Sequence, residues 1–178
     1  MSESSDPIRD AAPPREWVSE LFEQLEGKLI GFVYRRLGDR EAAQDVVQEA
    51  FVRLCQQSWP RIEERAEAWL YRTCRNRAID ISRREGRMRA IRSAQDVDTV
   101  RDEVGVKPED ASAEHEQLSR VREQVQELPE RQQELLRLRL QEGLSYKQIA
   151  DVTGLTVTNV GYLLHKTVSR LRGSLSVE

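Results

Sequence analysis

The sequence contains few of the residues on which metal sites, disulfides and β-rich folds depend. Its 178 residues include only 2 His, 2 Cys, 9 Gly and 6 Pro. Cys55 and Cys74 form no CxxC pair, so we predict no metal site and no cofactor. Few turn residues, together with many Leu, Arg, Glu, Gln and Ala, favour helices over a many-turned β fold. The composition predicts an all-α protein.

Long hydrophobic runs are also missing. A membrane-spanning helix needs a run of about 18 apolar residues, and the sequence has no such run. The first residues, MSESSDPIRDAAPPREW, lack the hydrophobic region of a signal peptide. We therefore expect a reduced, cytoplasmic protein without stable membrane insertion.

The net charge of −3 conceals two segments of opposite sign. Residues 71–92 hold eight Arg against two acids, whereas residues 93–115 hold seven acids against two basic residues. A nucleic acid would respond to the local charge, because salt screens charges beyond about 10 Å. The density of arginine alone fits either a nucleic-acid surface or a solvated helix end.

Hydrophobic periodicity predicts two helical domains. Apolar residues recur at helical spacing from Trp17 onward, and Asp39 is placed to cap the second helix. A third helix is predicted over about 66–89. Its expected buried residues are Trp69, Leu70, Cys74 and Ile81. The predicted organisation is a disordered tail over 1–14, a helical domain over 15–92, a flexible acidic linker over 93–115 and a second helical domain over 116–178.

Residues 145–164 have the pattern of a helix-turn-helix. Ala150 is small where two helices cross, and Gly154 stands where the turn favours a positive φ. Ser145 and Gln148 form a capping box, and Thr156 can cap the second helix. The apolar residues expected to hold the motif are Ile149, Leu155, Val160 and Leu163, with Leu135, Leu136, Leu138 and Leu140 on the helix before it. A helical hairpin without a DNA role is the alternative.

The second helix of this motif offers polar residues to DNA. Thr158, Asn159 and Tyr162 lie at its N-terminal end, where such a helix meets base edges. The residues better placed for phosphates are Lys147, His165, Lys166 and Arg170. Each of them could equally be an ordinary exposed side chain.

The arginine-rich third helix is another candidate DNA surface. Its polar residues at helical spacing form a stripe of Arg72, Asn76, Arg83 and Arg87. Trp59, Trp69 and Tyr71 are nearby in the sequence, and arginines beside aromatic rings suit unstacked single-stranded bases. Trp69 fits a place in the core better, and Trp59 is open to either interpretation.

The second helix carries Asp45, Gln48 and Glu49 beside its apolar face. Two carboxylates four residues apart can hold a metal ion or form an acid–base pair, but no His joins them, and such a pair on a helix is usually just exposed to solvent. We therefore predict no catalytic residue. A polar contact with a protein partner is the better functional interpretation.

The order of these parts resembles the extracytoplasmic-function (group IV) sigma factors of RNA polymerase. The matching segments are Asp45–Phe51, Trp69–Asp80 followed by Arg83-Arg84, Leu128–Leu140, and Gly143–Ala150 with the recognition helix. The resemblance implies a region 2-like domain followed by a region 4-like helix-turn-helix domain.

The resemblance also implies a role for each surface. It implies that Asp45, Gln48 and Glu49 dock on the clamp of core RNA polymerase, and that the second domain binds the minus-thirty-five element of promoter DNA. It assigns Arg72, Arg75, Asn76, Arg83 and Arg84 to DNA at the minus-ten element. The loop from Ser58 to Arg65 resembles the element that captures a flipped base, and many members are inhibited by an anti-sigma factor.

The recognition helix departs from the family pattern. Gly161, Leu163 and Val168 stand where the family commonly has basic residues. We expect fewer contacts to the minus-thirty-five element as a result, and a helix weakened by roughly 1 kcal/mol at the glycine.

A non-enzymatic sigma factor is thus the function that the sequence favours. The alternatives are a stand-alone helix-turn-helix regulator, a metal-dependent DNA-processing enzyme that uses Asp45 and Glu49, and a helical adaptor that binds only proteins.

Overall fold

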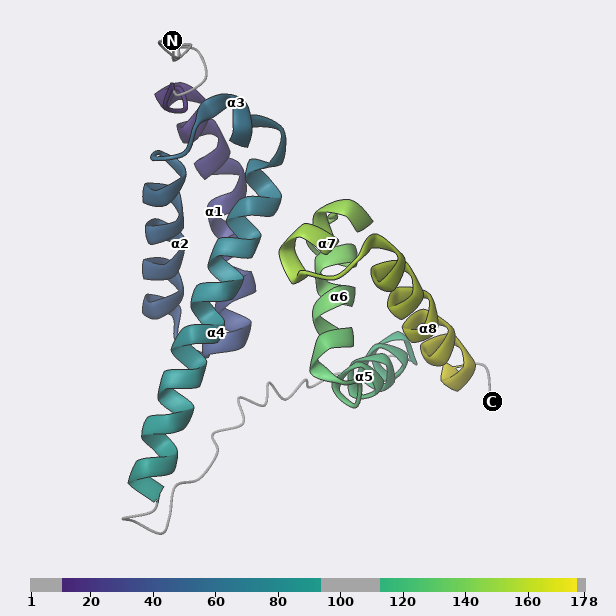
Figure 1. Cartoon of the computed structure of the whole chain (residues 1–178). Coiled ribbons are helices and arrows are strands. Elements are labelled where there is room, and N and C mark those ends of the chain that lie inside the picture. The colour runs from purple at the N-terminus through teal and green to yellow at the C-terminus, as the bar shows by residue number, and fades with distance from the viewer. Residues whose placement is uncertain (1–10, 94–112, 176–178) are drawn as a thin grey trace. The chain divides into compact units, whose positions relative to one another are not determined.

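The computed structural model describes residues 11–93 and 113–175, and all regular secondary structure in these ranges is helical. Contacts between helices divide the described residues into two compact units. The first is built on α1 to α4, and the second on α5, α6, α8 and most of α7 (Figure 1). The predictions of an all-α fold and of two helical domains are confirmed.

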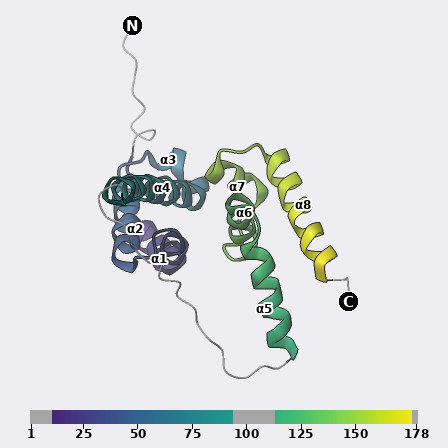
Figure 2. The same ribbon diagram turned by 90° about the horizontal axis from the view of Figure 1, so that it is seen from below.

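Three long helices pack on one another in the first unit. They are α1 (Arg15–Leu37), α2 (Arg40–Leu54) and α4 (Ala66–Ser93). Between α2 and α4 the chain forms the short helix α3 (Trp59–Ile62) and the 3-10 turn η1 (Glu63–Arg65). The segment expected to be a loop from Ser58 to Arg65 is therefore mostly helical. Figure 2 shows the three long helices grouped together in a view from below.

A tight turn separates α1 from α2. Gly38 has a φ of 72°, and its N–H donates to the carbonyl oxygen of Tyr34 at 2.7 Å. Asp39 Oδ1 then accepts hydrogen bonds from the N–H groups of Glu41 and Ala42 at 2.9 and 3.2 Å. Glycine adopts a positive φ without the steric cost of a Cβ, and the Asp39 cap was predicted and is confirmed.

The apolar faces of the three long helices meet in one core. The side chains that are fully buried there include Leu29, Val33, Val47, Leu54, Leu70 and Tyr71. Aromatic rings meet edge to face within this core. The ring centroids of Phe22 and Phe51 lie 4.9 Å apart, and those of Phe32 and Tyr71 lie 5.3 Å apart. Burying a side chain of this size contributes about 1.5–3 kcal/mol.

Helix α4 differs in detail from the predicted third helix. It continues to Ser93, beyond the predicted end near residue 89. Trp69 and Ile81, which were expected to be buried, are only half-buried. Leu70 and Cys74 are fully buried as predicted, and so is Tyr71, which the sequence analysis considered only as an aromatic residue near the arginine stripe.

The predicted disordered tail includes residues that the structure places. Pro13 is buried, and the carbonyl oxygen of Ala11 accepts a hydrogen bond from the N–H of Trp59 at 2.7 Å. Trp17 packs edge-on against Trp59 with a centroid separation of 4.5 Å. The ordered chain therefore begins before residue 15. Residues 1–10 lie outside the described residues.

Four helices make up the second unit. They are α5 (Ala113–Gln126), α6 (Glu130–Leu140), α7 (Tyr146–Thr153) and α8 (Val157–Leu175). Residues 113–115, assigned to the linker from the sequence, belong to α5, and residues 94–112 lie outside the described residues. Fully buried side chains of this unit include Leu135, Leu138, Leu144, Ile149 and Val160. Leu140 was expected to join them but is 73% exposed at the end of α6.

Among the described residues, no helix combines the length and the apolar composition needed to span a bilayer.

The two cysteines occupy contrasting environments. Cys55 is exposed, whereas Cys74 lies in the core of the first unit, where burial raises the pKa of its thiol from 9.0 to about 12. We expect Ellman's reagent to label one thiol per native chain and two per unfolded chain, because only a thiolate reacts. A Cys55→Ser variant should show no labelling in the native state. If the folded Cys55→Ser variant were labelled as fast as the folded wild-type protein, the placement of Cys74 would be contradicted.

The raised pKa of Cys74 also predicts a loss of stability in alkali. The buried thiol ionises only after unfolding, so its contribution to the free energy of unfolding is full below about pH 9 and disappears as the pH rises toward 12.

Candidate nucleic-acid interface

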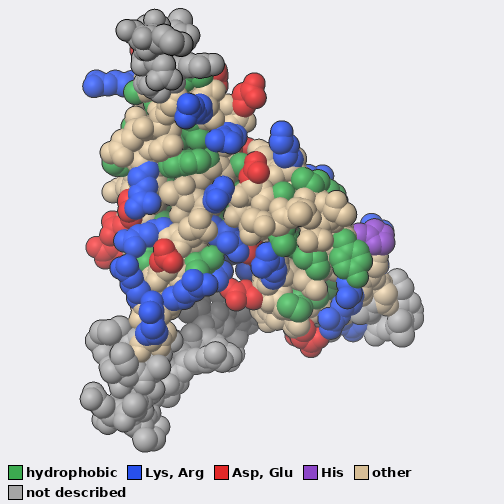
Figure 3. Space-filling model, viewed as in Figure 1, with side chains coloured by type: hydrophobic (Ala, Val, Ile, Leu, Met, Phe, Trp, Pro, Cys, Tyr) green, Lys and Arg blue, Asp and Glu red, His purple; other side chains and the backbone are tan. Residues whose placement is uncertain are grey.

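The arginine stripe of α4 lies on the side away from the core. Arg72, Asn76, Arg83 and Arg87 are all exposed. The side of the helix that faces α1 and α2 buries Leu70, Cys74 and Ala78. Figure 3 shows Lys and Arg side chains gathered over the C-terminal half of α4. The stripe predicted from helical spacing is therefore a surface feature.

The two further arginines that the resemblance assigned to DNA flank this stripe. Arg84 is exposed and Arg75 is half-buried. From Arg72 to Arg87 the stripe spans roughly 22 Å at 1.5 Å per residue, long enough to follow several phosphates of a DNA strand. Arg87 Nε donates to the Arg83 carbonyl oxygen at 3.3 Å, a weak contact that leaves most of its guanidinium in solvent.

Of the three aromatic residues near the stripe, one is excluded from the base stacking considered from the sequence. Tyr71 is fully buried against Phe32, so its ring cannot stack on a base. Trp59 is half-buried beside Trp17, and Trp69 is half-buried in α4. The exposed chemistry of α4 is therefore mainly cationic.

Helix α2 presents a different face. Asp45 and Gln48 are exposed, and Val52, one turn further along, is 61% exposed. Three residues at this spacing share one side of a helix. The sequence analysis gave Val52 no role, because only the polar residues beside the apolar face of this helix were considered for a partner. We call Asp45, Gln48 and Val52 the docking face.

Glu49 adjoins the docking face but is held by two arginines. Its Oε1 lies 2.6 Å from Arg53 NH2 in α2, and its Oε2 lies 3.0 Å from Arg77 Nε in α4. These ion pairs are partly exposed, so each contributes at most about 1 kcal/mol. They link α2 to α4, and the structure gives Glu49 a structural role that its sequence position did not indicate.

The same ion pairs weigh against a metal ion at Asp45 and Glu49. A bound cation would have to displace or share a carboxylate already occupied by two guanidinium groups. In the part of the chain that the structure describes, no three acidic, His or Cys side chains gather in a way that could hold a metal.

The predicted helix-turn-helix is present: its two helices are α7 and α8, with the predicted turn between them. Ser145 N–H donates to Gln148 Oε1 at 2.9 Å, and Gln148 N–H donates to Ser145 Oγ at 3.2 Å, which completes the capping box. Gly154 has a φ of 73°. Asn159 N–H donates to Thr156 Oγ1 at 3.2 Å, so Thr156 caps α8 as predicted.

The inner side of α8 differs by one position from the prediction. Val160, Leu164 and Thr167 are buried, whereas Leu155 and Leu163 are only half-buried. The residues predicted to face DNA share the opposite side and are all exposed. They are Lys147 on α7 and Thr158, Asn159, Tyr162, His165, Lys166 and Arg170 on α8.

Gly161 lies beneath the ring of Tyr146. A Cβ built at this glycine would meet Tyr146 Cε2 at 3.6 Å, an ordinary van der Waals contact. Tyr146 also lies near Arg139, whose Cζ is 5.4 Å from the ring centroid and whose NH1 donates to the Leu144 carbonyl oxygen at 3.0 Å. The aromatic ring therefore covers the part of α8 where the family commonly carries a basic side chain.

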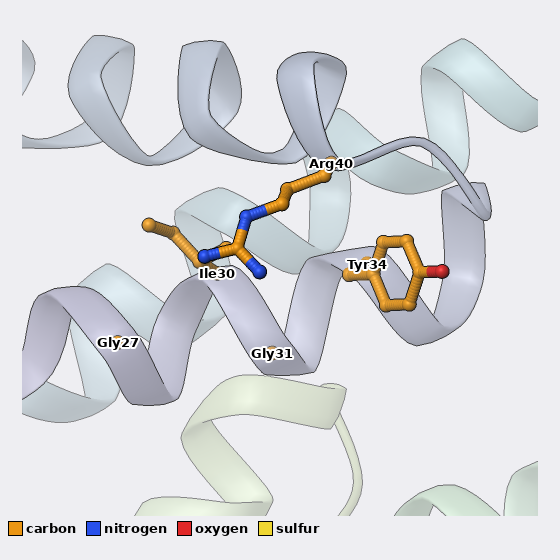
Figure 4. Close-up of a pocket in the computed structure, with 5 residues that line it drawn as sticks. All are labelled: Gly27, Ile30, Gly31, Tyr34 and Arg40. Carbon is orange, nitrogen blue, oxygen red and sulfur yellow. The ribbon is translucent and has the colours of Figure 1, made fainter.

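A shallow pocket of about 330 Å³ opens beside α1. It is lined by Gly27, Ile30, Gly31, Tyr34 and Arg40. Figure 4 shows Arg40 reaching from the start of α2 toward α1. None of the residues predicted to bind DNA or a protein partner lines it.

Comparisons with known proteins agree on one family. Residues 21–88 match the family described as Sigma-70 region 2, and residues 118–171 match Sigma-70, region 4. The ECF RNA polymerase sigma factor SigE of Mycolicibacterium smegmatis is 28% identical over 175 residues, which cover 96% of this chain and 66% of that protein. The chain thus spans just under two thirds of the length of that relative.

A solved structure shares the fold. It is the co-crystal structure of the sigma factor RpoE with the anti-sigma factor NepR from Bartonella quintana, with a TM-score of 0.63 and 19% identity. The match covers 92% of this chain and 99% of that one.

Two glycines of the helix-turn-helix should respond oppositely to the same change. Gly161→Ala should stabilise α8 by about 0.5–1 kcal/mol, because alanine favours the helix and its Cβ has room beside Tyr146. Gly154→Ala is the matched control and should destabilise the unit, because its φ is 73°. Hydrogen exchange of the α8 amides in the intact protein measures both. Faster exchange in the Gly161→Ala variant would contradict the packing described.

Proposed function

The chain belongs to the sigma-70 family, and within it to the extracytoplasmic-function sigma factors, and on that premise we propose that it is a non-enzymatic specificity subunit that brings core RNA polymerase to promoters. The observation that carries this proposal is the division of the first unit into two surfaces. One is the docking face of α2, and the other is the arginine stripe of α4.

The docking face suits a protein partner better than DNA. It combines a carboxylate, an amide and a 61% exposed valine. A carboxylate repels phosphate, whereas an exposed apolar side chain beside polar groups is typical of a protein interface. We propose that Asp45, Gln48 and Val52 contact core polymerase at its clamp, with Glu49 at the edge of the contact.

The arginine stripe suits the phosphate backbone. Its cations are exposed along one side of α4, so they can neutralise successive phosphates without any change in the core. We propose that Arg72, Arg75, Asn76, Arg83 and Arg84 lie along DNA at the minus-ten element. The helix-turn-helix of the second unit binds the minus-thirty-five element in this proposal, with Lys147, Lys166 and Arg170 at phosphates.

An inhibitory partner is a further part of the proposal. The solved relative with the same fold is bound to an anti-sigma factor. We propose that an anti-sigma protein also holds this chain inactive in the cytoplasm until polymerase binding is required.

The alternatives leave one of the two surfaces unexplained. A stand-alone helix-turn-helix regulator gives no role to the docking face, and an adaptor that binds only proteins gives none to the arginine stripe. A metal-dependent enzyme conflicts with the two ion pairs of Glu49.

Run-off transcription with purified core polymerase tests the docking face. We expect Asp45→Ala and Gln48→Ala each to weaken the affinity for core polymerase about tenfold, because residues at the centre of an interface dominate its binding energy. Promoter-specific transcripts should fall in proportion and recover at high protein concentration. Glu23→Ala, which removes an exposed acid from α1, is the control and should leave both unchanged. Full affinity in the Asp45→Ala variant would place the polymerase contact elsewhere.

A salt titration tests the arginine stripe. We expect Arg83→Ala to weaken promoter binding by the polymerase complex and to reduce the slope of log affinity against log salt by about 1. Lys28→Ala removes an exposed cation from α1 and should leave the slope unchanged. Equal slopes for the wild-type and Arg83→Ala proteins would show that α4 does not contact phosphate.

A further inference from the structure

The base-facing end of the recognition helix carries no cation. From Val157 to Tyr162 its exposed side chains are Val157, Thr158, Asn159 and Tyr162, and the first Lys or Arg of α8 is Lys166. The N-terminal residues of such a helix contact base edges, whereas residues further along reach phosphates. The part of α8 that reads bases is therefore neutral.

Guanine is ordinarily read by arginine or lysine, which donates to its O6 and N7 atoms. The nearby basic residues are not placed for that contact. Arg139 is exposed but engaged within the unit, with its guanidinium 5.4 Å from the Tyr146 ring centroid and NH1 donating to the Leu144 carbonyl oxygen at 3.0 Å. Lys147 lies in the first turn of α7, the helix that crosses the DNA backbone in this motif.

Exposed apolar surface takes the place of the missing cations. Val157 is 48% exposed, Tyr162 is 63% exposed and Tyr146 is 42% exposed. The Tyr146 ring lies over Gly161, one turn after Val157 and next to Tyr162 in the sequence. The exposed apolar side chains therefore lie in the area of the first two turns of α8. In the major groove the apolar partner is the 5-methyl group of thymine.

Asn159 supplies the polar contact within this area. Its N–H is held by Thr156 Oγ1 at 3.2 Å, which places it in the first turn of α8, and its side chain is exposed. An asparagine amide can pair with adenine by accepting from N6 and donating to N7.

The charge of α8 favours DNA over a protein as the occupant of this surface. The helix contains Lys166, Arg170 and Arg172 and no acidic residue. A protein interface of similar apolar content would not need cations along the later turns of the helix, whereas contact with a phosphate backbone does.

We infer that this recognition helix reads adenine and thymine, with Asn159 pairing to an adenine and Val157, Tyr146 and Tyr162 contacting thymine methyl groups. This inference rests on the proposed function, because it takes the second unit to bind promoter DNA. The specificity of the recognition helix for the minus-thirty-five element then comes from A·T pairs, and guanine contributes little to it.

Selection by the polymerase complex tests the base preference. The intact protein with core polymerase is incubated with a duplex library whose minus-thirty-five block is randomised, and bound DNA is sequenced. We expect A·T pairs to be enriched at the positions in contact with α8. Enrichment of G·C pairs there would overturn the inference but not the proposed function. Failure to form a complex with core polymerase would instead contradict the proposed function.

Modified bases then separate the two contacts. Replacing a contacted thymine with uracil removes only the methyl group and should weaken binding about fourfold. Replacing the contacted adenine with 7-deazaadenine removes N7 and should weaken binding by the wild-type protein about tenfold. The Asn159→Ala variant should bind adenine and 7-deazaadenine templates equally well. It should still bind uracil templates more weakly than thymine templates, a difference that a variant with an unfolded helix would not show.

Two controls complete the experiment. Lys166→Ala should weaken binding to every template by the same factor, because phosphates carry no sequence information. Tyr162→Ala should reduce the difference between thymine and uracil templates. Equal affinity of the wild-type protein for thymine and uracil templates would overturn the inference and assign the apolar surface to a protein partner.

Discussion

The burial of one side of α4 against α1 and α2 determines the direction of every functional side chain on that helix. Leu70, Tyr71 and Cys74 are fully buried there. Rotating α4 about its axis would expose these side chains and push arginines into the core, and burying an unpaired charge is far more costly than burying an apolar group is favourable. The exposure of the arginine stripe is thus a consequence of the core.

The contact between α2 and α4 joins the surface proposed for polymerase to the surface proposed for DNA. The two helices pack directly on each other, and Glu49 of α2 pairs with Arg77 of α4 at 3.0 Å. Neither helix can shift relative to the other without disturbing the core that they share. A rigid link of this kind would set the position of DNA strands relative to polymerase, which a specificity subunit must do accurately.

The second unit serves binding in a different way. Its recognition helix is short of cations at the base-facing end, so its affinity for DNA alone should be low. In the proposed function, tethering to a first unit bound to polymerase compensates, because the second contact then forms at a high effective concentration. Weak contacts with a defined base preference can therefore discriminate among promoters without holding the polymerase there.

The sequence by itself determined the helical fold, both domains, the caps at Asp39, Ser145 and Thr156, and the exposed face of α8, because periodicity and capping are local properties. Only the tertiary structure decided the burial of Tyr71, the exposure of Leu140 and the ion pairs of Glu49. Each of these depends on which neighbouring helix covers a given side of the chain. Residues distant in sequence set that arrangement, and no local pattern reports it.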